Sequence, residues 1–388
     1  MRTLSLIRAT AITLFLFAAT TARANEAPKP AASDREAVLA KLKANGVNLN
    51  GLTIAAKDGG PAVNLGTGEN SGEANSANDE NLRLVAWLPE VERVSLFKGK
   101  FTKDGLAALA ALPKLRYLQV YACDVPAEAF SILGELKGLK ALELGEYRVT
   151  DELLGYAGAV RGLKRLEITR TDGMTPAGVA KFLDSVDGLE GLLLFGDVID
   201  DACMKRIGQM KDMKRFWTDS KKITPAAWGN LAGLTKMKDL FLRGTSFDDA
   251  GMRALEGMRD IESLILTNTQ VTDTGMTSLA GLTKLHDLGL DGTKITDQGM
   301  ANLKGMTELD NLYVGMTDVT AKGLAFVPKK ERMSMMRTGK AALTPKEFGE
   351  VMGMYPQTQI FDPSGYWTTD RIQAAMKELR KEVPMPKK

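Results

Sequence analysis

The sequence predicts an α/β solenoid with a horseshoe architecture, in which a parallel sheet lines the concave side and helices cover the convex side. Three observations predict it. The apolar pattern repeats every 24 residues from Leu88 almost to the C-terminus, and a fixed period of this length is typical of stacked repeats. Within each repeat, two apolar residues flank a variable one. A Thr or Asp then precedes a segment with the apolar spacing of a helix.

The period is clearest in four consecutive repeats that begin at Leu234, Met258, Leu282 and Met306. Counting the first residue as position 0, apolar residues occupy positions 0, 3, 6 and 8, and a small residue occupies position 11. One repeat, Val160–Ser185, has 26 residues, and we expect its insertion to bend or mark the array locally. Twelve repeats follow the pattern, beginning at Leu88, Leu112, Leu136, Val160, Val186, Met210, Leu234, Met258, Leu282, Met306, Lys330 and Met354.

Each repeat predicts a strand, a turn and a helix. Positions 6 and 8 indicate a short strand with one face inward, because side chains alternate between the two faces of a strand. Positions 18 and 21, such as Met300 and Leu303, indicate one core-facing side of a helix. Position 14 is Thr or Asp in ten of the twelve repeats, and either residue can accept a hydrogen bond from the free N–H groups at a helix start. These ten are Thr102, Thr150, Asp200, Thr224, Asp248, Thr272, Thr296, Thr320, Thr344 and Thr368.

The ends of the array differ from its middle. A solenoid needs caps, because a terminal repeat would otherwise expose its apolar face. We therefore expect the array with its C-terminal capping units at residues 88–377 and a solvated tail at 378–388. Residues 34–87 predict an N-terminal cap and a degenerate first repeat, with a helix over 34–44, short strands over 52–54 and 62–65, a loop over 66–78 and a helix over 79–88.

The first 24 residues have the composition of a secretory signal peptide. Arg2 and Arg8 precede an apolar run, and Ala22-Arg23-Ala24 is a small-x-small cleavage pattern. The run of about 11 residues is too short for a membrane-spanning helix, which needs ~20. We expect cleavage before Asn25, export to the periplasm or the extracellular space, and no transmembrane segment afterwards. Residues 25–33 predict a polar linker.

Charge and cysteine usage narrow the classes of partner. Loss of Arg2, Arg8 and Arg23 with the signal peptide changes 51 basic against 48 acidic residues to 48 against 48, a neutral balance that does not favour nucleic acid. Cys123 and Cys203 lie in repeats three apart, so strands ~4.8 Å apart separate them by about 14 Å or more. A disulfide requires ~7 Å or less between Cα atoms. We expect two buried free thiols.

These positions together resemble leucine-rich repeats of the type Leu-x-x-Leu-x-x-Leu-x-Leu-x-x-(Cys/Thr)-x-Ile-Thr-Asp-x-Gly-Leu. Leu282–Gly305 matches almost throughout, and Cys123 falls on the Cys/Thr position. The chain resembles the cysteine-containing class known from F-box proteins, and also exported bacterial proteins built of such repeats. The resemblance implies a solenoid that binds a protein or another ligand. Because the signal peptide predicts export, an F-box-type adaptor in the cytoplasm is a weaker alternative.

The sequence offers little catalytic chemistry. His286, the one histidine, occupies a position at the edge of a predicted strand and indicates a surface residue. Gly66-Thr-Gly68 lacks the third glycine of a dinucleotide-binding loop, and no metal-protease or nucleophile-elbow pattern occurs. The Asp pairs at 200–201 and 248–249 lie at predicted helix starts, where capping explains them. We therefore expect a non-enzymatic protein with no catalytic residue, cofactor or metal site.

The concave face is the candidate binding surface. Position 7 points away from the core, and from residue 193 to residue 265 it carries a large apolar residue in four consecutive repeats. Position 9 adds Phe97, Tyr121 and Phe195, and a polar rim comprises Arg165, Arg215, Asp239, Arg243 and Asp287. Contiguous exposed apolar surface usually marks an interaction site, and Trp and Tyr are common anchors. The candidate partner-binding residues are Leu193, Phe195, Arg215, Trp217, Phe241, Arg243, Ile265 and Tyr313.

Other interpretations of the same residues stay open. An apolar row across parallel strands can simply stabilise the sheet. The divergent repeat that begins at Met210 can also slip by one residue, which would turn Trp217 inward and expose Phe216. The sequence thus favours an exported scaffold that recognises a protein, with a glycan as the alternative ligand. A structural, envelope-organising repeat protein without a discrete ligand is the competing hypothesis.

Overall fold

The computed structural model describes residues 32–49, 52, 60–66, 76–328, 335–337, 344–354, 359–362 and 365–366. The expected signal peptide, most of the linker and the C-terminal tail lie outside these residues. The chain divides into two compact units, Met1–Arg170 and Thr171–Lys388. The division falls inside Val160–Ser185, the one repeat with 26 residues. None of the helices in the described part of the chain is long and apolar enough to span a bilayer.

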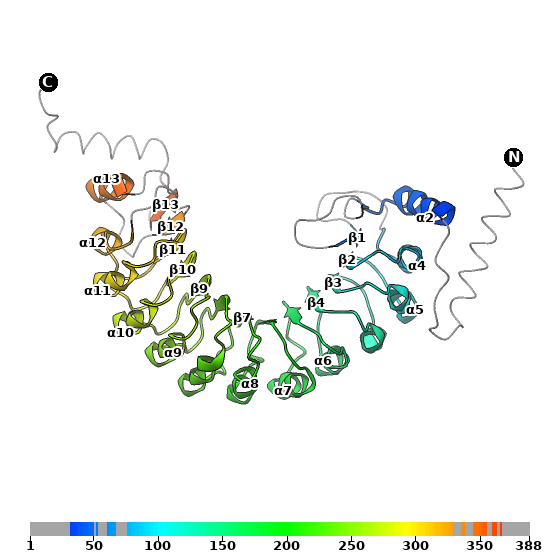
Figure 1. Cartoon of the computed structure of the whole chain (residues 1–388), viewed down its shortest axis with the longest axis horizontal. Helices are drawn as coiled ribbons and strands as arrows, with labels where there is room; N and C mark the ends of the chain where they lie inside the picture. Colours follow the sequence, from blue (N-terminus) through cyan, green and yellow to red (C-terminus); the bar gives the residue numbers. More distant parts are fainter. Residues whose placement is uncertain are drawn as a thin grey trace, which may run out of the picture. The chain divides into compact units, whose positions relative to one another are not determined.

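The first unit is a parallel sheet in which neighbours in sequence are neighbours in the sheet, with a helix after each strand of the array. Its strands and helices lie in separate layers (Figure 1). The elements are α2 (Ala32–Ala44), β1 (Ala62–Leu65), α4 (Asp79–Val85), β2 (Arg93–Phe97), α5 (Lys103–Ala107), η1 (Ala108–Ala111), β3 (Tyr117–Tyr121), η2 (Ala127–Glu135), β4 (Ala141–Gly145), α6 (Asp151–Gly158) and β5 (Arg165–Ile168).

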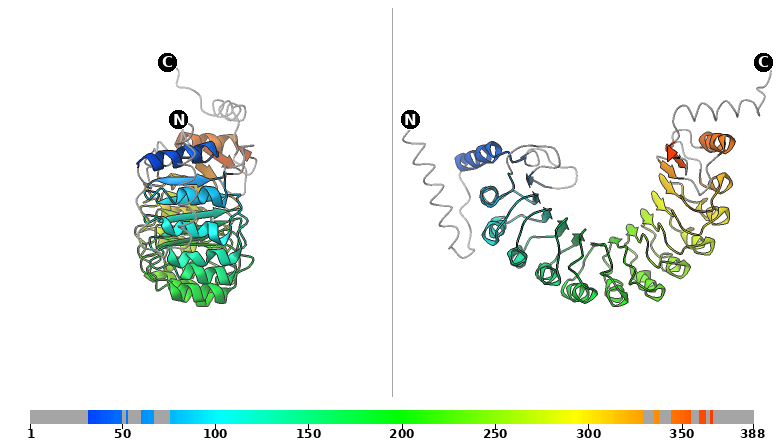
Figure 2. Two further views of the ribbon diagram at one scale, coloured as in Figure 1. Left: turned by 90° about the vertical axis from the view of Figure 1, so that its right-hand side faces the viewer. Right: turned by 180° about the vertical axis from the view of Figure 1, so that it is seen from behind.

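The second unit repeats this arrangement, and its strands pair in parallel from β6 to β13, with β14 antiparallel at the end. Its helices cover one face and leave the other to the strands (Figures 1 and 2). The elements are α7 (Pro176–Ser185), β6 (Gly191–Leu194), α8 (Asp201–Ile207), β7 (Arg215–Trp217), η3 (Pro225–Gly233), β8 (Asp239–Phe241), α9 (Asp249–Arg253), β9 (Ser263–Ile265), α10 (Asp273–Met276), η4 (Thr277–Leu279), β10 (Asp287–Gly289), α11 (Asp297–Met300), η5 (Ala301–Leu303), β11 (Asn311–Tyr313), α12 (Ala321–Leu324), β12 (Met335–Arg337), α13 (Pro345–Met354), β13 (Gln359–Asp362) and β14 (Gly365–Tyr366).

The apolar period builds the core as expected. In the repeat that begins at Leu282, every apolar position of the pattern is fully buried: Leu282, Leu285, Leu288, Leu290, Ile295, Met300 and Leu303. Strands advance by 24 residues, as in the pairing of Leu264 with Leu288 and of Leu288 with Leu312. Because each repeat buries its apolar side only against its neighbours, the stack gains stability through the contacts between repeats.

Position 14 caps the helices as predicted in most repeats. The hydroxyl of Thr296 accepts a hydrogen bond from the N–H of Gln298 at 3.2 Å, and Thr102, Thr150, Asp200, Asp248, Thr272 and Thr320 cap their helices in the same way. Thr344 accepts from the N–H of Glu347. Thr224 makes no such cap, and the 26-residue repeat uses Thr175, one position later. Thr368 lies outside the described residues.

The Asp pairs do more than cap. Asp248 caps α9, but Asp249 accepts hydrogen bonds from the N–H and hydroxyl of Thr272 in the next repeat, at 2.8 and 2.6 Å. Asp201 makes the same contacts with Thr224. The interpretation of both members of each pair as caps is therefore wrong for the second member. That aspartate joins consecutive repeats.

Position 11 satisfies a backbone carbonyl inside the core. The buried hydroxyl of Thr293 donates to the carbonyl of Leu290, three residues earlier, at 2.6 Å, and Thr245, Thr269 and Thr317 do the same in their repeats. Cys123 is the thiol counterpart, with its Sγ 3.4 Å from the carbonyl oxygens of Leu96 and Tyr121. Small polar hydrogen-bonding side chains suit this position because an unpaired buried carbonyl is costly.

The N-terminal cap departs from expectation in detail. Its helix begins at Ala32, two residues before the predicted start, and β1 coincides with the predicted strand. Leu52 is helical, whereas a strand was expected there, and residues 53–54 lie outside the described residues. Most of the predicted 66–78 loop also lies outside them. The side chain of Asn78, at its end, caps α4 by accepting from the N–H of Asn81 at 3.0 Å.

Candidate functional site

The candidate site is a row of side chains on the strand face of the second unit. Parallel pairing aligns Leu193 with Trp217, Trp217 with Phe241, and Phe241 with Ile265. We call these four residues the apolar ladder. The row continues to Gly289 and then to Tyr313, a half-buried residue. The predicted partner-binding residues of position 7 therefore share one face of one sheet.

The register places Trp217 on this face. Phe216 is fully buried, whereas Trp217 is half-buried. The interpretation in which this repeat slips by one residue is therefore wrong. The buried position is occupied by the side chain with the smaller ring, and the larger indole lies toward the strand face.

The ladder is stacked rather than loosely exposed. The rings of Trp217 and Phe241 lie with centroids 5.5 Å apart at 31°, and Phe195 approaches Phe241 edge-on at 6.3 Å. Ile265 leans over Gly289, where a Cβ would lie 2.9 Å from the Ile265 Cδ1. These contacts are the sheet-stabilising kind that the sequence left open, and aromatic pairs of this geometry contribute about 0.5–1.5 kcal/mol.

Leu193 departs from the expectation of an exposed residue, because it is only 5% exposed. Bulky side chains on strands ~4.8 Å apart cover one another, which sequence spacing alone does not show. Trp217, Phe241 and Ile265 are half-buried, so they still present apolar surface to solvent.

One flank of the ladder is electrically balanced. Nε of Arg215 lies 3.0 Å from Asp239, an ion pair rather than a well-aligned hydrogen bond, and the guanidinium lies 5.4 Å from the Trp217 ring centre. Burial raises the pKa of Asp239, and Arg215 opposes that shift. Further along, Asn311 donates a hydrogen bond to Asp287. The predicted rim residues of this flank therefore neutralise one another or pair with a neutral amide.

The other flank contains Arg243, which is exposed. Among the described residues it has no hydrogen bond, ion pair or ring contact. Asp219 and Asp291 occupy the same position in other repeats and are used internally, because they accept the N–H groups of Gly196 and Gly315 at 2.5 and 2.8 Å. Arg243 thus differs from its counterparts.

The strand face of the first unit has a different character. The hydroxyl of Tyr117 and the amide of Gln119 donate to Oε2 of Glu143 at 2.5 and 3.1 Å, and Arg165 donates to Oε1 at 2.6 Å. The guanidinium of Arg93 lies 3.9 Å above the Tyr117 ring. Burial and the hydrogen bond to Glu143 raise the pKa of Tyr117, so the phenol stays neutral. Arg165, predicted in the rim of the ladder, instead belongs to this network.

Tyr117 is the residue that sequence analysis missed. It stands at position 5, next to the inward residue at position 6, and a strand pattern predicts only that it faces the same side as Gln119. In the structure it is only 7% exposed. A tyrosine between Arg93 and Arg165 in the row of position 5 was the available signal, because cationic side chains commonly stack on aromatic rings.

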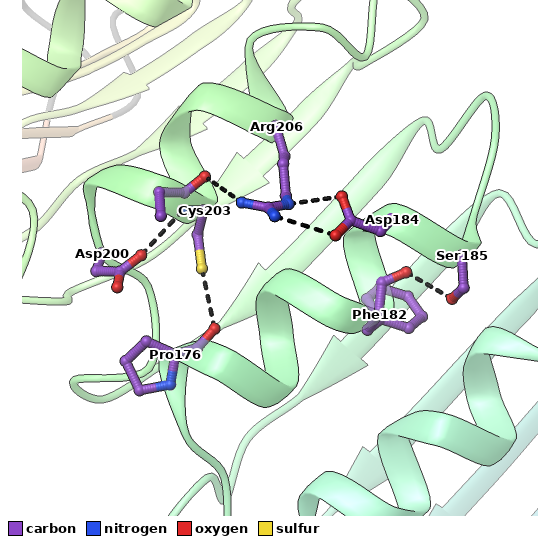
Figure 3. A network of polar contacts seen from close by, with 8 residues as sticks. Pro176, Phe182, Asp184, Ser185, Asp200, Cys203 and Arg206 are labelled. Carbon is purple, nitrogen blue, oxygen red and sulfur yellow. Dashed lines mark hydrogen bonds and ion pairs between the residues drawn. The ribbon is translucent and has the colours of Figure 1, made fainter.

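The two thiols are structural. Both are buried and free, as predicted. Figure 3 shows Cys203 beside Asp200, which caps its helix, and its Sγ lies 3.4 Å from the carbonyl oxygen of Pro176. In the same contact between α7 and α8, Arg206 makes two hydrogen bonds with Asp184, at 2.6 and 3.0 Å. Burial raises the pKa of Cys203 to about 12 and also raises the pKa of Cys123, which keeps both thiols protonated.

Titratable groups do not gather into a pocket around the ladder. His286 has a half-exposed side chain, and its Nδ1 lies 3.1 Å from Asp310 in the next repeat. Across the residues that the structure describes, no group of three or more His, Cys, Asp or Glu side chains is placed to hold a metal ion. The chemistry of the described strand face is therefore that of a surface for contacts.

Comparisons with known proteins bear on the fold. Residues 257–280 match the Leucine Rich repeat family model, a span of one period. No curated protein matches the sequence significantly. An internalin from Listeria monocytogenes is similar in structure, with a TM-score of 0.55 and 16% identity over 86% of this chain and 94% of that one.

A second similar structure is a chain of the yeast Rad7–Elc1 complex. Its TM-score is 0.59, with 15% identity over 93% of each chain. At these identities the likeness concerns the fold. The buried 24-residue pattern, the parallel sheet and the matched repeat together identify this chain as a leucine-rich-repeat solenoid protein.

Proposed function

We propose that this protein is an exported, non-enzymatic scaffold that binds a protein partner on the strand face of its second unit, through the apolar ladder and Phe195. One observation carries the proposal: Trp217, Phe241 and Ile265 stand in consecutive strands and remain half-buried, although the core beneath them is complete. Apolar side chains that a core does not need are the usual centre of a protein interface.

The contrast with the first unit supports this choice of surface. There the strand face is occupied by Tyr117, Glu143 and Arg165, whose polar groups satisfy one another. A partner would have to break these contacts before gaining its own. On the ladder, a partner would displace only water from apolar surface, which is favourable at about 25 cal/mol per Å².

Export rests on the N-terminal sequence. The basic start, the short apolar run and the Ala22-Arg23-Ala24 pattern support a signal peptide cleaved before Asn25. N-terminal sequencing of the protein purified from its native host tests this part. A mature chain that begins at Asn25 is expected, and an intact Met1 would refute cleavage.

Site-specific photo-crosslinking in the native host tests the binding surface. A benzophenone amino acid replaces Trp217 in one variant and Lys205, an exposed residue of α8 on the helix face, in the control. We expect a discrete protein adduct from position 217 and none from position 205. The fold is compatible with such a role, since the similar yeast chain was solved in a complex of Rad7 with Elc1.

Two results would reject the proposal. Identical adducts from both positions would indicate non-specific proximity. Absence of any protein adduct from position 217 would favour the alternatives, a glycan ligand or a purely structural array in which the ladder only stabilises the sheet.

A further inference from the structure

The two flanks of the apolar ladder differ in what they leave unpaired. On the position-5 flank, Arg215 meets Asp239 at 3.0 Å, and Asp287 accepts a hydrogen bond from Asn311. A charged group of a partner arriving there would compete with an existing internal contact. This flank therefore contributes little charge selection.

The position-9 flank has one uncompensated cation within the described part of the repeat array. Asp219 is held by the N–H of Gly196, and Asp291 is buried against the N–H of Gly315. Arg243 stands between their repeats, exposed, and makes no contact with another described polar or aromatic side chain. Its guanidinium keeps its full hydrogen-bonding capacity for a partner.

Arg243 lies on the same face as the ladder. Along the chain Phe241 is half-buried, Leu242 is fully buried and Arg243 is exposed, the alternation expected when the first and third side chains share a face. Two residues of strand span about 7 Å. A partner side chain packed on Phe241 therefore has a neighbour within reach of Arg243.

The chemistry of the missing partner group follows from Arg243. Arginine presents a planar fork of donors that matches a carboxylate in two parallel hydrogen bonds, and such charge-assisted bonds are stronger than neutral ones. A lysine or arginine of a partner at the same place would be repelled, so the position also selects against basic segments.

We propose that the partner segment on the apolar ladder carries an aspartate or glutamate that pairs with Arg243, next to an apolar side chain that packs on Trp217 and Phe241. This inference rests on the proposed function and adds the chemical class of the partner to it. In these terms the protein is a receptor for acidic–apolar segments, with Arg243 as the residue that sets charge specificity.

Random 12-residue peptides displayed on phage provide the probe. They are selected on the mature wild-type protein and counter-selected on Trp217→Ala, so that only ladder-dependent binders survive. Synthetic versions of these peptides are then titrated against wild type, Arg243→Gln and Arg253→Gln. Arg253 is an exposed arginine of α9 in the same repeat, so its variant makes the same charge change away from the strand face.

We expect the surviving peptides to share an Asp or Glu beside an apolar residue. Arg243→Gln should weaken their binding by about fivefold or more, the loss typical of a charge-assisted hydrogen bond. Arg253→Gln should leave it unchanged. Replacing the peptide's acid by its amide should weaken binding to wild type but add nothing to the loss in Arg243→Gln.

The failures are distinguishable. Ladder-dependent peptides that lack acidic residues and bind wild type and Arg243→Gln equally would overturn the inference and leave the proposed function standing. If no peptide depends on Trp217, the proposed function fails, and the inference fails with it.

Discussion

Asp273 on the first turn of α10 accepts two hydrogen bonds from Thr296 of the next repeat, from its N–H at 2.8 Å and from its hydroxyl at 2.6 Å. Thr296 in turn caps α11. The same carboxylate-to-threonine link joins Asp79 with Thr102, Asp249 with Thr272, and Asp297 with Thr320. One residue pair therefore starts a helix and couples it to its neighbour.

The link explains the glycine of the Thr-Asp-x-Gly motif. A Cβ at Gly299 would overlap Oδ1 of Asp273, and Gly275 and Gly323 stand in the same relation to Asp249 and Asp297. We expect Gly299→Ala to lower the free energy of unfolding by about 1–3 kcal/mol, since the buried carboxylate contact must shift. Gly305→Ala, where a Cβ meets nothing within 4 Å, is the control and should not destabilise. Urea denaturation with an equal loss for both variants would contradict this role for the motif.

Position 10 of the repeat provides a second test, because the backbone there is left-handed in most repeats. Gly292 has φ 66° and Met316 has φ 56°. Gly292→Ala should cost about 1–2 kcal/mol for the strained backbone, and its Cβ would also overlap Oδ1 of Asn268. Met316 is 60% exposed, so Met316→Gly loses little packing and should be neutral or slightly stabilising. Thermal melting that shows Met316→Gly to be the more damaging change would refute this assignment.

The Tyr117–Glu143 contact should contribute to the stability of the first unit. Tyr117→Phe leaves the carboxylate with one donor fewer at a site where tyrosine is almost fully buried, and should cost about 1–2 kcal/mol. Tyr156, whose hydroxyl donates to Glu152 at 2.9 Å on the surface of α6, is the matched control. Tyr156→Phe should change stability immeasurably. Equal urea midpoints for both variants would show that the Tyr117 network contributes nothing.

The buried thiols predict resistance to modification and a definite pH dependence. Native protein at pH 8 should not react with an aromatic disulfide reagent, and both thiols should react after unfolding. Because the folded pKa of Cys203 is raised to about 12, its contribution to stability is complete below the unfolded thiol pKa near 9 and declines as pH rises toward 12. Cys203→Ala should flatten that alkaline decline. Rapid labelling of the native protein would contradict the burial of the thiols.

The fold was predictable because its determinants are periodic. Leu282, Leu288 and Met300 repeat at spacings that only a stacked strand–helix unit satisfies, and Thr296 announces its helix by type and position. Side-chain contacts between repeats were less accessible. Sequence spacing does not reveal that Asp249 reaches Thr272 rather than capping its own helix, because both roles require an aspartate at a helix start.

The site was predictable only in its placement. The pattern predicted that Trp217 and Phe241 share a face, which the structure has. It did not predict the near-complete burial of Leu193, since coverage depends on how adjacent side chains lean. Nor did it separate Arg215 from Arg243. Only coordinates show that one is paired and the other is free of contacts with described residues.

The affinity of the partner captured at position 217 tests the central claim most directly. It is measured with wild type, Trp217→Ala and Tyr121→Ala, alongside the melting temperature of each protein. Tyr121 stacks on Phe97 with centroids 6.1 Å apart on the strand face of the first unit and is the matched aromatic control. We predict that Trp217→Ala weakens binding by about tenfold or more and that Tyr121→Ala does not. Unchanged affinity for Trp217→Ala together with a lowered melting temperature would show that the ladder only stabilises the sheet.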